Sequence, residues 1–310
     1  MTLSRNVLES IGNTPIVQLR KVVPSNCARI VVKLEWANPT GSMKDRMAKE
    51  VIEHAETNGR LGPGGTVVEY TSGTTGISLA MVCAAKGYGF HAVFSDAFSD
   101  DKRHAMKAFN AQITDVQSDR KRITEELIKA MIEKSREISQ KPGHWWSDQL
   151  NNQDAILGYY PLGEEIWNQL NGKVDALVHV VGTAHSIHGA AKSLRKHKPD
   201  LHVSAVEPAE SAVLSGRSTG AHEIEGIGIG FIPPLWEPDQ VDEIIAVTSE
   251  QAKAMARRLA REEGLFAGTS SGANVVAAIS VAQTLGPDAT VATILVDSGL
   301  RYLSTDLYKR

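Results

Sequence analysis

One lysine of the sequence lies where a turn-rich loop leads into a helical run. Residues 38–46 are Asn-Pro-Thr-Gly-Ser-Met-Lys-Asp-Arg, and this lysine is Lys44. The Asn-Pro and Thr-Gly pairs indicate a loop, and Ser42 is a suitable N-cap for a helix that continues through Val51 and Ile52. A lysine in a helix is usually a solvated surface charge. Held in a fixed place at a helix start, its amine could instead act as a nucleophile or a general base.

A second candidate is the loop formed by residues 71–76, Thr-Ser-Gly-Thr-Thr-Gly. It follows a strand-like run and precedes an apolar, alanine-rich helical run. Its hydroxyls, its glycines and the free amides of a helix start are suited to binding a carboxylate. A Gly/Thr turn is more often only a turn, so this loop alone is moderate evidence. Residues 182–189 and 268–273 form two further polar loops that open helices.

These motifs occur in an order that resembles the cysteine synthase and cystathionine β-synthase family of pyridoxal phosphate (PLP) enzymes. Residues 38–46 are similar to the family's Asn-Pro-Thr-Gly-Ser-x-Lys-Asp-Arg motif around its Schiff-base lysine. The opening segment 11–16, the active-site loop 226–233 and the closing run 301–305 also resemble the family. The resemblance covers nearly the whole chain. It implies a two-domain α/β fold of the tryptophan synthase β-like PLP type, with mostly parallel twisted sheets flanked by helices.

The resemblance also implies site roles. Lys44 would carry PLP as a Schiff base and act as the catalytic base. The other cofactor-binding residues would be Thr74, Gly182, Thr183, Ala184, His185, Ser186 and Ser270. The substrate-binding residues would be Thr71, Ser72, Gly73, Thr75, Gln149 and Gly228. Ser270 would face the pyridine nitrogen as a neutral hydroxyl, which makes the ring a milder electron sink than a carboxylate partner would.

The chain departs from the family pattern in two of these loops. Thr74 replaces an asparagine that contacts the ring oxygen of the cofactor. Ala184 and His185 replace two glycines of the phosphate-binding loop, and Ser186 replaces a threonine, so backbone freedom is lost. His185 could supply an N–H donor or a partial positive charge to the phosphate. Alternatively, His185 and His188 merely cover the helix start. Their spacing could suit a metal, but no cysteine or carboxylate lies nearby, and we expect no metal.

The implied activity is PLP-dependent β-replacement on an activated serine. Its simplest form is cysteine synthesis from O-acetylserine and sulfide via an aminoacrylate. Within the enzyme class, the alternatives are O-phosphoserine or serine as substrate, or elimination as a cysteine desulfhydrase or a dehydratase. A non-catalytic family member that binds serine acetyltransferase is an alternative from another class. The resemblance favours a homodimer, with serine acetyltransferase as a further partner.

Strand-like and helix-like runs alternate along most of the chain, which is typical of α/β layers with doubly covered parallel strands. We expect strands at residues 29–34, 66–70, 90–94, 111–116, 176–181, 203–208 and 290–297. We expect helices at residues 100–109, 123–138, 159–170, 190–197, 251–263 and 274–285. The expected domains are an N-terminal one (1–150) with a mobile part at about 83–130, and a C-terminal PLP-phosphate-binding one (151–310). Residues 13–34 could cross to the C-terminal domain.

The composition favours small-molecule partners. The chain has 310 residues, of which 42% are hydrophobic and 22% charged, and its net charge of −3 argues against nucleic acid or an anionic membrane surface. Cys27 and Cys83 lie far apart in apolar surroundings, as free thiols of a reducing compartment would. The sequence shows no membrane span and no signal-peptide core. We therefore expect a cytoplasmic protein.

Overall fold

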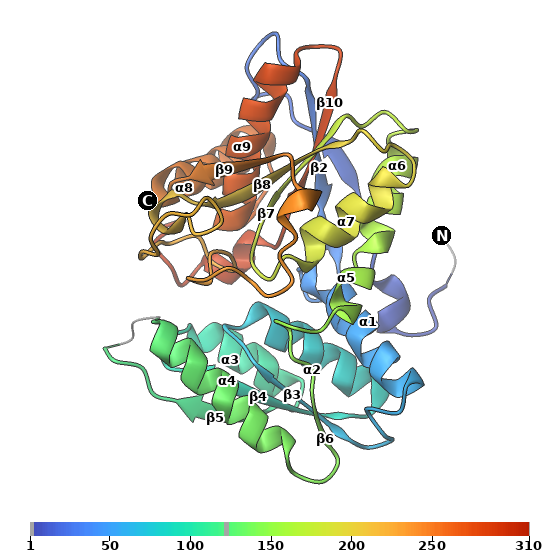
Figure 1. Ribbon diagram of the computed structural model, residues 1–310, viewed down its shortest axis with the longest axis vertical. Coiled ribbons are helices and arrows are strands. Elements are labelled where there is room, and N and C mark those ends of the chain that lie inside the picture. The colour runs from blue at the N-terminus through green and yellow to red at the C-terminus, as the bar shows by residue number, and fades with distance from the viewer. Residues whose placement is uncertain (1–2, 121–123, 310) are drawn as a thin grey trace. The chain divides into compact units, whose positions relative to one another are not determined.

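The computed structural model describes residues 3–120 and 124–309, and it forms two compact units. The first unit contains the residues up to Ile11 and the segment Lys44–Gly158. The second contains Gly12–Met43 and the residues from Tyr159 onward. Each unit is built on one sheet flanked by helices, so the predicted α/β class with mostly parallel strands is confirmed (Figure 1).

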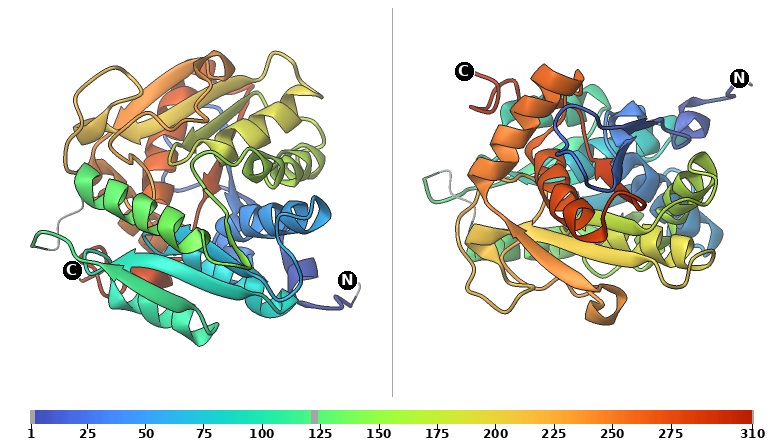
Figure 2. Two further views of the ribbon diagram at one scale, coloured as in Figure 1. Left: turned by 60° about the horizontal axis from the view of Figure 1, so that its bottom comes forward. Right: turned by 90° about the horizontal axis from the view of Figure 1, so that it is seen from above.

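The first unit contains a parallel four-stranded sheet with the order β5-β4-β3-β6. Its strands are β3 (Thr66–Tyr70), β4 (Gly89–Ser95), β5 (Gln112–Val116) and β6 (His144–Trp146). Its helices are α1 (Lys44–Thr57), α2 (Thr74–Lys86), α3 (Asp100–Ala108), α4 (Glu125–Ser139) and α5 (Asp154–Leu157), with a 3₁₀ turn at Val7–Ser10. Helices α1, α2 and α3 pack in sequence, and α4 covers β3, β4 and β6 (Figure 2).

The second unit contains a six-stranded sheet with the order β1-β2-β10-β7-β8-β9, in which the β1–β2 pair is antiparallel and the other pairs are parallel. Its strands are β1 (Ile16–Gln18), β2 (Arg29–Leu34), β7 (Ala176–Val180), β8 (His202–Pro208), β9 (Glu243–Val247) and β10 (Thr290–Leu295). Its α-helices are α6 (Tyr160–Gln169), α7 (His185–Arg195), α8 (Ser249–Arg258) and α9 (Thr269–Leu285). Short helical turns lie at Glu35–Ala37, Ala209–Ser211, Pro238–Gln240 and Gly299–Tyr302, and a π-helical turn lies at Leu259–Glu263.

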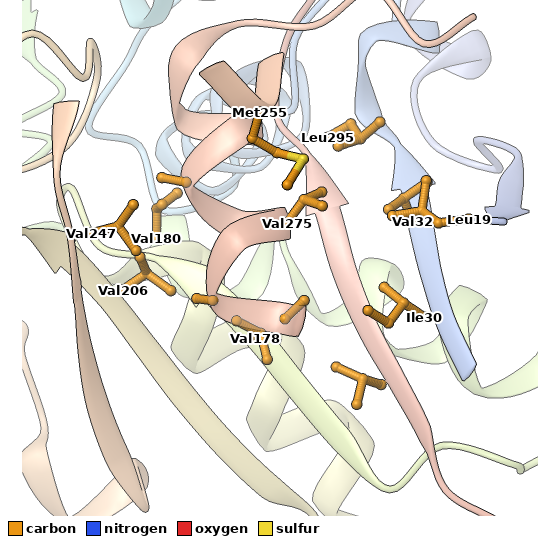
Figure 3. Packing of buried hydrophobic residues seen from close by; sticks show 14 of the residues in the cluster. Leu19, Ile30, Val32, Val178, Val180, Val206, Val247, Met255, Val275 and Leu295 are labelled. Atoms are coloured by element: carbon orange, nitrogen blue, oxygen red, sulfur yellow. The ribbon is translucent and has the colours of Figure 1, made fainter. Parts of the chain in front are cut away.

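The core of the second unit explains why its central strands are mostly apolar. Strands β7 and β10 are buried along their whole length, because helices cover both faces of the sheet. Helix α9 is rich in alanine and valine and packs between α8 and the sheet, and its Val275 belongs to the same hydrophobic cluster as Val178, Val180 and Leu295 (Figure 3). Gly272 permits this packing, because a Cβ there would overlap the backbone of α8.

Several helices begin earlier than the sequence predicts. Helix α7 begins at His185 and α9 at Thr269, each five residues before the predicted start, and α8 begins at Ser249, two residues before it. Small polar residues favour caps and turns, and this preference hid the first turns of these helices. As a consequence, Ser186 and Ser270 lie within helices and not in the loops before them.

The predicted helix at 123–138 corresponds to α4, whose N-cap Thr124 accepts a hydrogen bond from the amide of Leu127. Ile123, the predicted first residue, lies outside the described residues. None of the described helices is both long and apolar enough to cross a membrane.

Candidate active site

Three segments of the second unit meet at the carboxyl edge of its sheet. Strands β2, β10 and β7 are parallel neighbours, so the segments that follow them emerge at the same edge. The segment after β2 leads to Lys44, the one after β7 is the loop at 181–184, and the one after β10 is 296–298. Ligands of open α/β sheets bind at such edges. The backbone topology alone therefore brings two predicted site segments, the one that leads to Lys44 and the loop after β7, to one edge beside the segment 296–298.

The loop that precedes Lys44 is fixed by backbone hydrogen bonds. The amide of Met43 donates to the carbonyl of Val296 over 3.0 Å, and the amide of Ser298 donates to the carbonyl of Gly41 over 3.1 Å. Lys44 is the first residue of α1, and its side chain is partly buried. The lysine therefore starts its helix from a backbone that the segment after β10 holds in place.

The closing run of the chain supports the same loop. Arg301 donates a hydrogen bond from Nη2 to the carbonyl of Thr40. The hydroxyl of Tyr302 donates to a carboxylate oxygen of Asp297 over 3.1 Å, and burial raises the pKa of Tyr302. Gly268 must be a glycine, because a Cβ there would overlap both Asp297 and the ring of Tyr302. These close contacts give the residues of the closing run 301–305 a structural role: they support the loop before Lys44.

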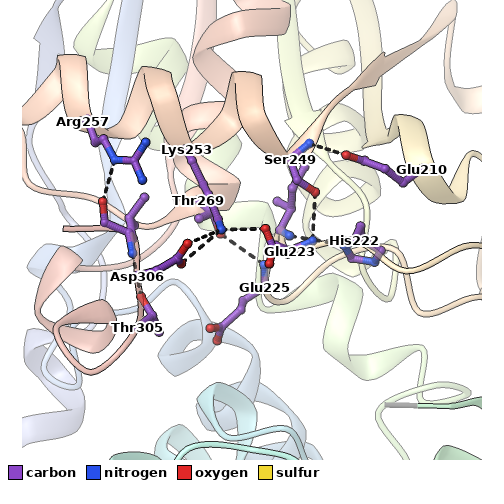
Figure 4. A network of polar contacts seen from close by, with 12 residues as sticks. Glu210, His222, Glu223, Glu225, Ser249, Lys253, Arg257, Thr269, Thr305 and Asp306 are labelled. Atoms are coloured by element: carbon purple, nitrogen blue, oxygen red, sulfur yellow. Dashed lines mark hydrogen bonds and ion pairs between the residues drawn. The ribbon is translucent and has the colours of Figure 1, made fainter. Parts of the chain in front are cut away.

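Ser270 lies buried in the first turn of α9, and its neighbours fix that turn. Ser271 Oγ accepts a hydrogen bond from the amide of Val296 over 2.9 Å. Thr269 Oγ1 accepts one from the amide of Glu225 over 3.1 Å (Figure 4). The first turn of α9 therefore lies beside the segment that holds the lysine loop and beside the glycine-rich loop that follows Glu225.

The loop after β7 has the geometry of an anion site at a helix start. Its last residue, Ala184, is the N-cap of α7 and has left-handed backbone angles (φ 68°, ψ −10°), and no described side chain caps the helix. Gly182 leaves no room for a Cβ, which would lie 2.6 Å from the carbonyl of Gly226. The amide of Gly228 donates to the carbonyl of Val181 over 3.2 Å. The glycine-rich loop thus runs directly along the loop after β7.

The two histidines of α7 have different surroundings. His185 is buried, and its Nδ1 lies 3.0 Å from Thr183 Oγ1. His188 is also buried, its Nε2 accepts a hydrogen bond from the amide of Glu237 over 3.1 Å, and its ring packs against Trp236. Burial lowers the pKa of His188 to about 4, so this ring is neutral at pH 7. His188 therefore holds the segment at 236–237, whereas His185, the first residue of α7, contacts Thr183 of the loop after β7.

In the first unit, the loop after β3 leads into α2 by a compact turn. Thr71 Oγ1 accepts hydrogen bonds from the amides of Gly73 (2.9 Å) and Gly76 (3.0 Å). Helix α2 begins at Thr74, and its N-cap Gly73 forms no side-chain capping bond within the described part of the chain. Thr74 and Thr75 therefore lie in a first turn whose amides and dipole favour an anion.

Gln149 lies against the end of β3, next to this loop. Its Nε2 donates to the carbonyl of Tyr70 over 2.8 Å, and its amide donates to Glu69 Oε2 over 2.9 Å. Glu69 also accepts hydrogen bonds from Ser147 Oγ (2.7 Å) and Trp146 Nε1 (3.3 Å). Complete burial raises the pKa of Glu69 to about 8, although these donors oppose the shift. A buried carboxyl group thus fixes the backbone of Gln149.

The structure gathers most predicted site residues into two groups. The second unit holds together Gly182, Thr183, Ala184, His185, Ser186, Gly228 and Ser270. The first unit holds together Thr71, the exposed Ser72, Gly73, Thr74, Thr75 and Gln149. Sequence reasoning missed Glu69, His179 and Asn274, whose buried side chains support these groups. Each is a polar residue inside an otherwise apolar run, and that pattern is the signal that could have found them.

Comparisons with known proteins agree with these motifs. A family model described as pyridoxal-phosphate dependent enzyme matches residues 7–297. A cysteine synthase of Staphylococcus aureus (strain N315) is 42% identical over 305 residues, which are 98% of this chain and 96% of that protein. The crystal structure of a cysteine synthase from Entamoeba histolytica has a TM-score of 0.94 and 36% identity, and the match covers 100% of this chain and 92% of that one.

The crystal structure of an O-ureido-L-serine synthase has a TM-score of 0.92 and 35% identity, and the match covers 99% of this chain and 96% of that one. These matches confirm the predicted resemblance and the predicted fold. Because the family model spans most of the residues and the similarity extends over the whole fold, this chain belongs to the family of pyridoxal-phosphate dependent enzymes.

Proposed function

We propose that this enzyme catalyses PLP-dependent β-replacement on an activated serine, with cysteine synthesis from O-acetylserine and sulfide as its activity. One observation carries the proposal. The loop before Lys44, the first turn of α9 and the loop after β7 lie together at the carboxyl edge of one sheet. The similarity to proteins named cysteine synthase supports this choice among the reactions of the family.

The residues at this edge fit the cofactor. The first turn of α7 lacks a side-chain cap among the described residues, and the hydroxyls of Thr183 and Ser186 lie in the same loop and turn. We propose that these groups hold the phosphate. Ser270 would face the ring nitrogen as a neutral partner, and Lys44 would attach the cofactor through its amine. When bound, PLP supplies an electron sink for the charge that develops at the α-carbon of the amino acid.

The other proposed roles follow from the geometry of each group. The amine of Lys44 would take the α-proton of the substrate as general base. The first turn of α2 would bind the substrate carboxylate through its amides. The oxygen of Thr71 already accepts two loop amides, so its proton remains to be donated to an acceptor such as that carboxylate. Gln149 and Gly228 would complete the substrate site.

A related reaction on another β-substituted serine is the second candidate. The structural similarity to an O-ureido-L-serine synthase favours it, as do the departures at Thr74, Ala184 and His185. This second candidate includes enzymes that act on O-phosphoserine or serine. It also includes enzymes that catalyse elimination as a desulfhydrase or a dehydratase. A non-catalytic protein that binds serine acetyltransferase would retain no turnover with any serine ester. Assays with a panel of serine esters separate these outcomes.

We also propose a cytoplasmic homodimer that can bind serine acetyltransferase. Both cysteines are free thiols in the structure, and burial raises the pKa of Cys83, which suits a reducing compartment. The homodimer and the partner rest on the family resemblance. Light scattering of the purified protein, alone and with serine acetyltransferase, tests both assemblies.

The decisive experiment removes the proposed attachment point. Purified Lys44→Ala should lose the visible absorption band of lysine-bound PLP after dialysis and should form no cysteine from O-acetylserine and sulfide. Lys49→Ala is the matched control, because Lys49 lies in the same helix and donates to the carbonyl of Leu8. This control should keep both the band and the activity. A Lys44→Ala protein that keeps the band after dialysis would show that the assignment is wrong.

A further inference from the structure

A buried chain of hydrogen bonds connects α9 to α7 through His179 of β7. Asn274, His179 and Ser186 are 0%, 1% and 9% exposed. Asn274 Nδ2 lies 3.2 Å from His179 Nδ1, and His179 Nε2 lies 2.8 Å from Ser186 Oγ. The chain therefore ends at a hydroxyl in the helix turn for which we propose phosphate binding.

The surroundings of Asn274 determine which way its amide points. Its Oδ1 receives a hydrogen bond from the backbone N–H of Val180 over 2.7 Å, and a backbone N–H can only donate. Its Nδ2 lies 2.7 Å from the carbonyl oxygen of Ile294, which can only accept. The second N–H of the amide is therefore the donor toward His179 Nδ1. The two backbone partners remove the usual ambiguity of amide orientation.

This orientation determines the tautomer of His179. Because Nδ1 accepts a hydrogen bond from Asn274, the neutral ring carries its proton on Nε2. That N–H then donates to Ser186 Oγ, and the serine oxygen acts as the acceptor. The proton of the serine hydroxyl cannot point to His179, and it is directed to a different acceptor.

We infer that His179 is a positioning residue for the cofactor phosphate, because it keeps the hydroxyl of Ser186 in the orientation that donates. A phosphate dianion offers only acceptors, so a hydroxyl fixed as a donor suits it better than one that rotates freely. Asn274 holds the histidine ring in the required tautomer. This inference rests on the proposed function, since it requires phosphate at the first turn of α7.

The first experiment determines the tautomer in the protein without cofactor. Apoprotein labelled with ¹⁵N-histidine is studied by two-bond ¹H–¹⁵N correlation, and the signal that disappears in His179→Gln is assigned to His179. We expect a protonated Nε2 and an unprotonated Nδ1 at pH 7.5. A proton on Nδ1, or on both nitrogens, would overturn the inference whatever the activity of the enzyme.

The second experiment is a double-mutant cycle on PLP affinity, measured by equilibrium dialysis. Ser186→Ala and His179→Phe should each weaken PLP binding about tenfold, and the double variant should be no weaker than either. His179→Gln, which retains a donor near the position of Nε2, should stay within about threefold of the wild type. His91→Phe is the matched control, because His91 is also a buried strand histidine bonded to a hydroxyl, that of Thr114. It should leave PLP affinity unchanged.

The outcomes are distinct. Multiplicative losses in the double variant would mean that His179 acts only through the general stability of the fold, and the inference would be wrong. An unchanged affinity in Ser186→Ala, in a protein that keeps the band of lysine-bound PLP, would also overturn it and leave the proposed function standing. A wild-type protein without that band would instead refute the proposed function. If His179→Phe does not fold, the tautomer and the His179→Gln affinity decide.

Discussion

Ala184 shows how one residue links the backbone to the proposed chemistry. Seven described non-glycine residues have positive φ angles, and Ala184 is the one among them that lacks a polar side chain. It turns the chain from β7 into α7, where glycine would take the same conformation without contact between Cβ and the backbone. This chain therefore makes the turn with an alanine in a left-handed conformation, at a cost in stability.

The Ala184→Gly variant should therefore be more stable than the wild type, and not less. Relief of the left-handed alanine is partly offset by the larger entropy of glycine in the unfolded chain, so the expected gain is up to about 1 kcal/mol. Urea unfolding of the apoproteins measures it. Ala191→Gly is the matched control, because Ala191 is a buried interior residue of the same helix and should lose at least about 0.5 kcal/mol. A loss in Ala184→Gly equal to that of the control would contradict the argument.

At the same scale, the sequence predicted which residues gather but not how each is used. The motif around Lys44 and the serines at the start of α9 can be recognised from the amino-acid sequence. The role of Thr71 could not be recognised in this way. Its Oγ1 accepts hydrogen bonds from the amides of Gly73 and Gly76, and these bonds depend on the path of the loop. His179 was invisible for another reason: its partner Asn274 is distant in sequence and becomes a neighbour only through the packing of α9 on the sheet.

At the scale of elements, the central strands and the edge strand β5 were predicted, whereas the edge strands β1, β6 and β9 were missed. Strands β7, β8 and β10 are largely buried and rich in valine, alanine, leucine or isoleucine, and this composition indicates strands in the sequence. Strands β1, β6 and β9 lie at sheet edges and are only partly buried. Strands β1 and β6 have three residues each, and the apolar run at 244–247 in β9 is short, so the local signal of all three is weak. Pairing with a neighbour defines such strands, and pairing is a long-range property that local patterns do not contain.

The helix α3 has a direct contact with the proposed substrate loop. The aliphatic part of Lys102 lies against Gly73, where a Cβ would overlap it. This contact belongs to the segment predicted to be mobile, at about 83–130, of which residues 121–123 lie outside the described part. A carboxylate bound at the first turn of α2 would therefore act on a loop that already touches α3.

We expect this segment to close when an amino acid binds, because the carboxylate supplies contact energy that only the closed state completes. Hydrogen exchange in α3 and α4 should slow by about tenfold or more with bound amino acid. Lys102→Ala, which removes the contact, should reduce this protection, whereas Lys102→Met retains the aliphatic part and should preserve it. Equal exchange with and without the amino acid would rule out closure of this segment.

At the scale of the whole molecule, buried charged groups connect distant parts of the chain. In the second unit, Lys253 of α8 binds Glu223 over 2.6 Å and Asp306 over 2.9 Å (Figure 4). Burial alone would lower the pKa of Lys253, but the hydrogen bonds to these carboxylates outweigh it and raise the pKa. These two ion pairs connect the region before the glycine-rich loop and the end of the chain to helix α8. In the first unit, the buried Glu69 likewise bonds to several segments, but the contacts described above give its carboxyl group no cationic partner.

This difference gives Glu69 a measurable effect on the stability of the protein. Its pKa is raised to about 8 by burial, above the usual 4.5 of the unfolded chain. Between these values the folded state binds one proton more than the unfolded state, so the free energy of unfolding falls as pH rises. Its contribution is fully present below about pH 4.5 and is lost as pH passes about 8, and the change is at most about 5 kcal/mol.

Glu69→Gln should remove this dependence, whatever its effect on overall stability, because an amide does not titrate. Denaturant unfolding of the apoprotein at about pH 5.5, 7 and 8.5 measures the slope. Ser147→Ala is the control: it keeps the carboxyl group and removes a donor that lowers its pKa, so the slope should persist. A slope in Glu69→Gln equal to that of the wild type would show that another group titrates.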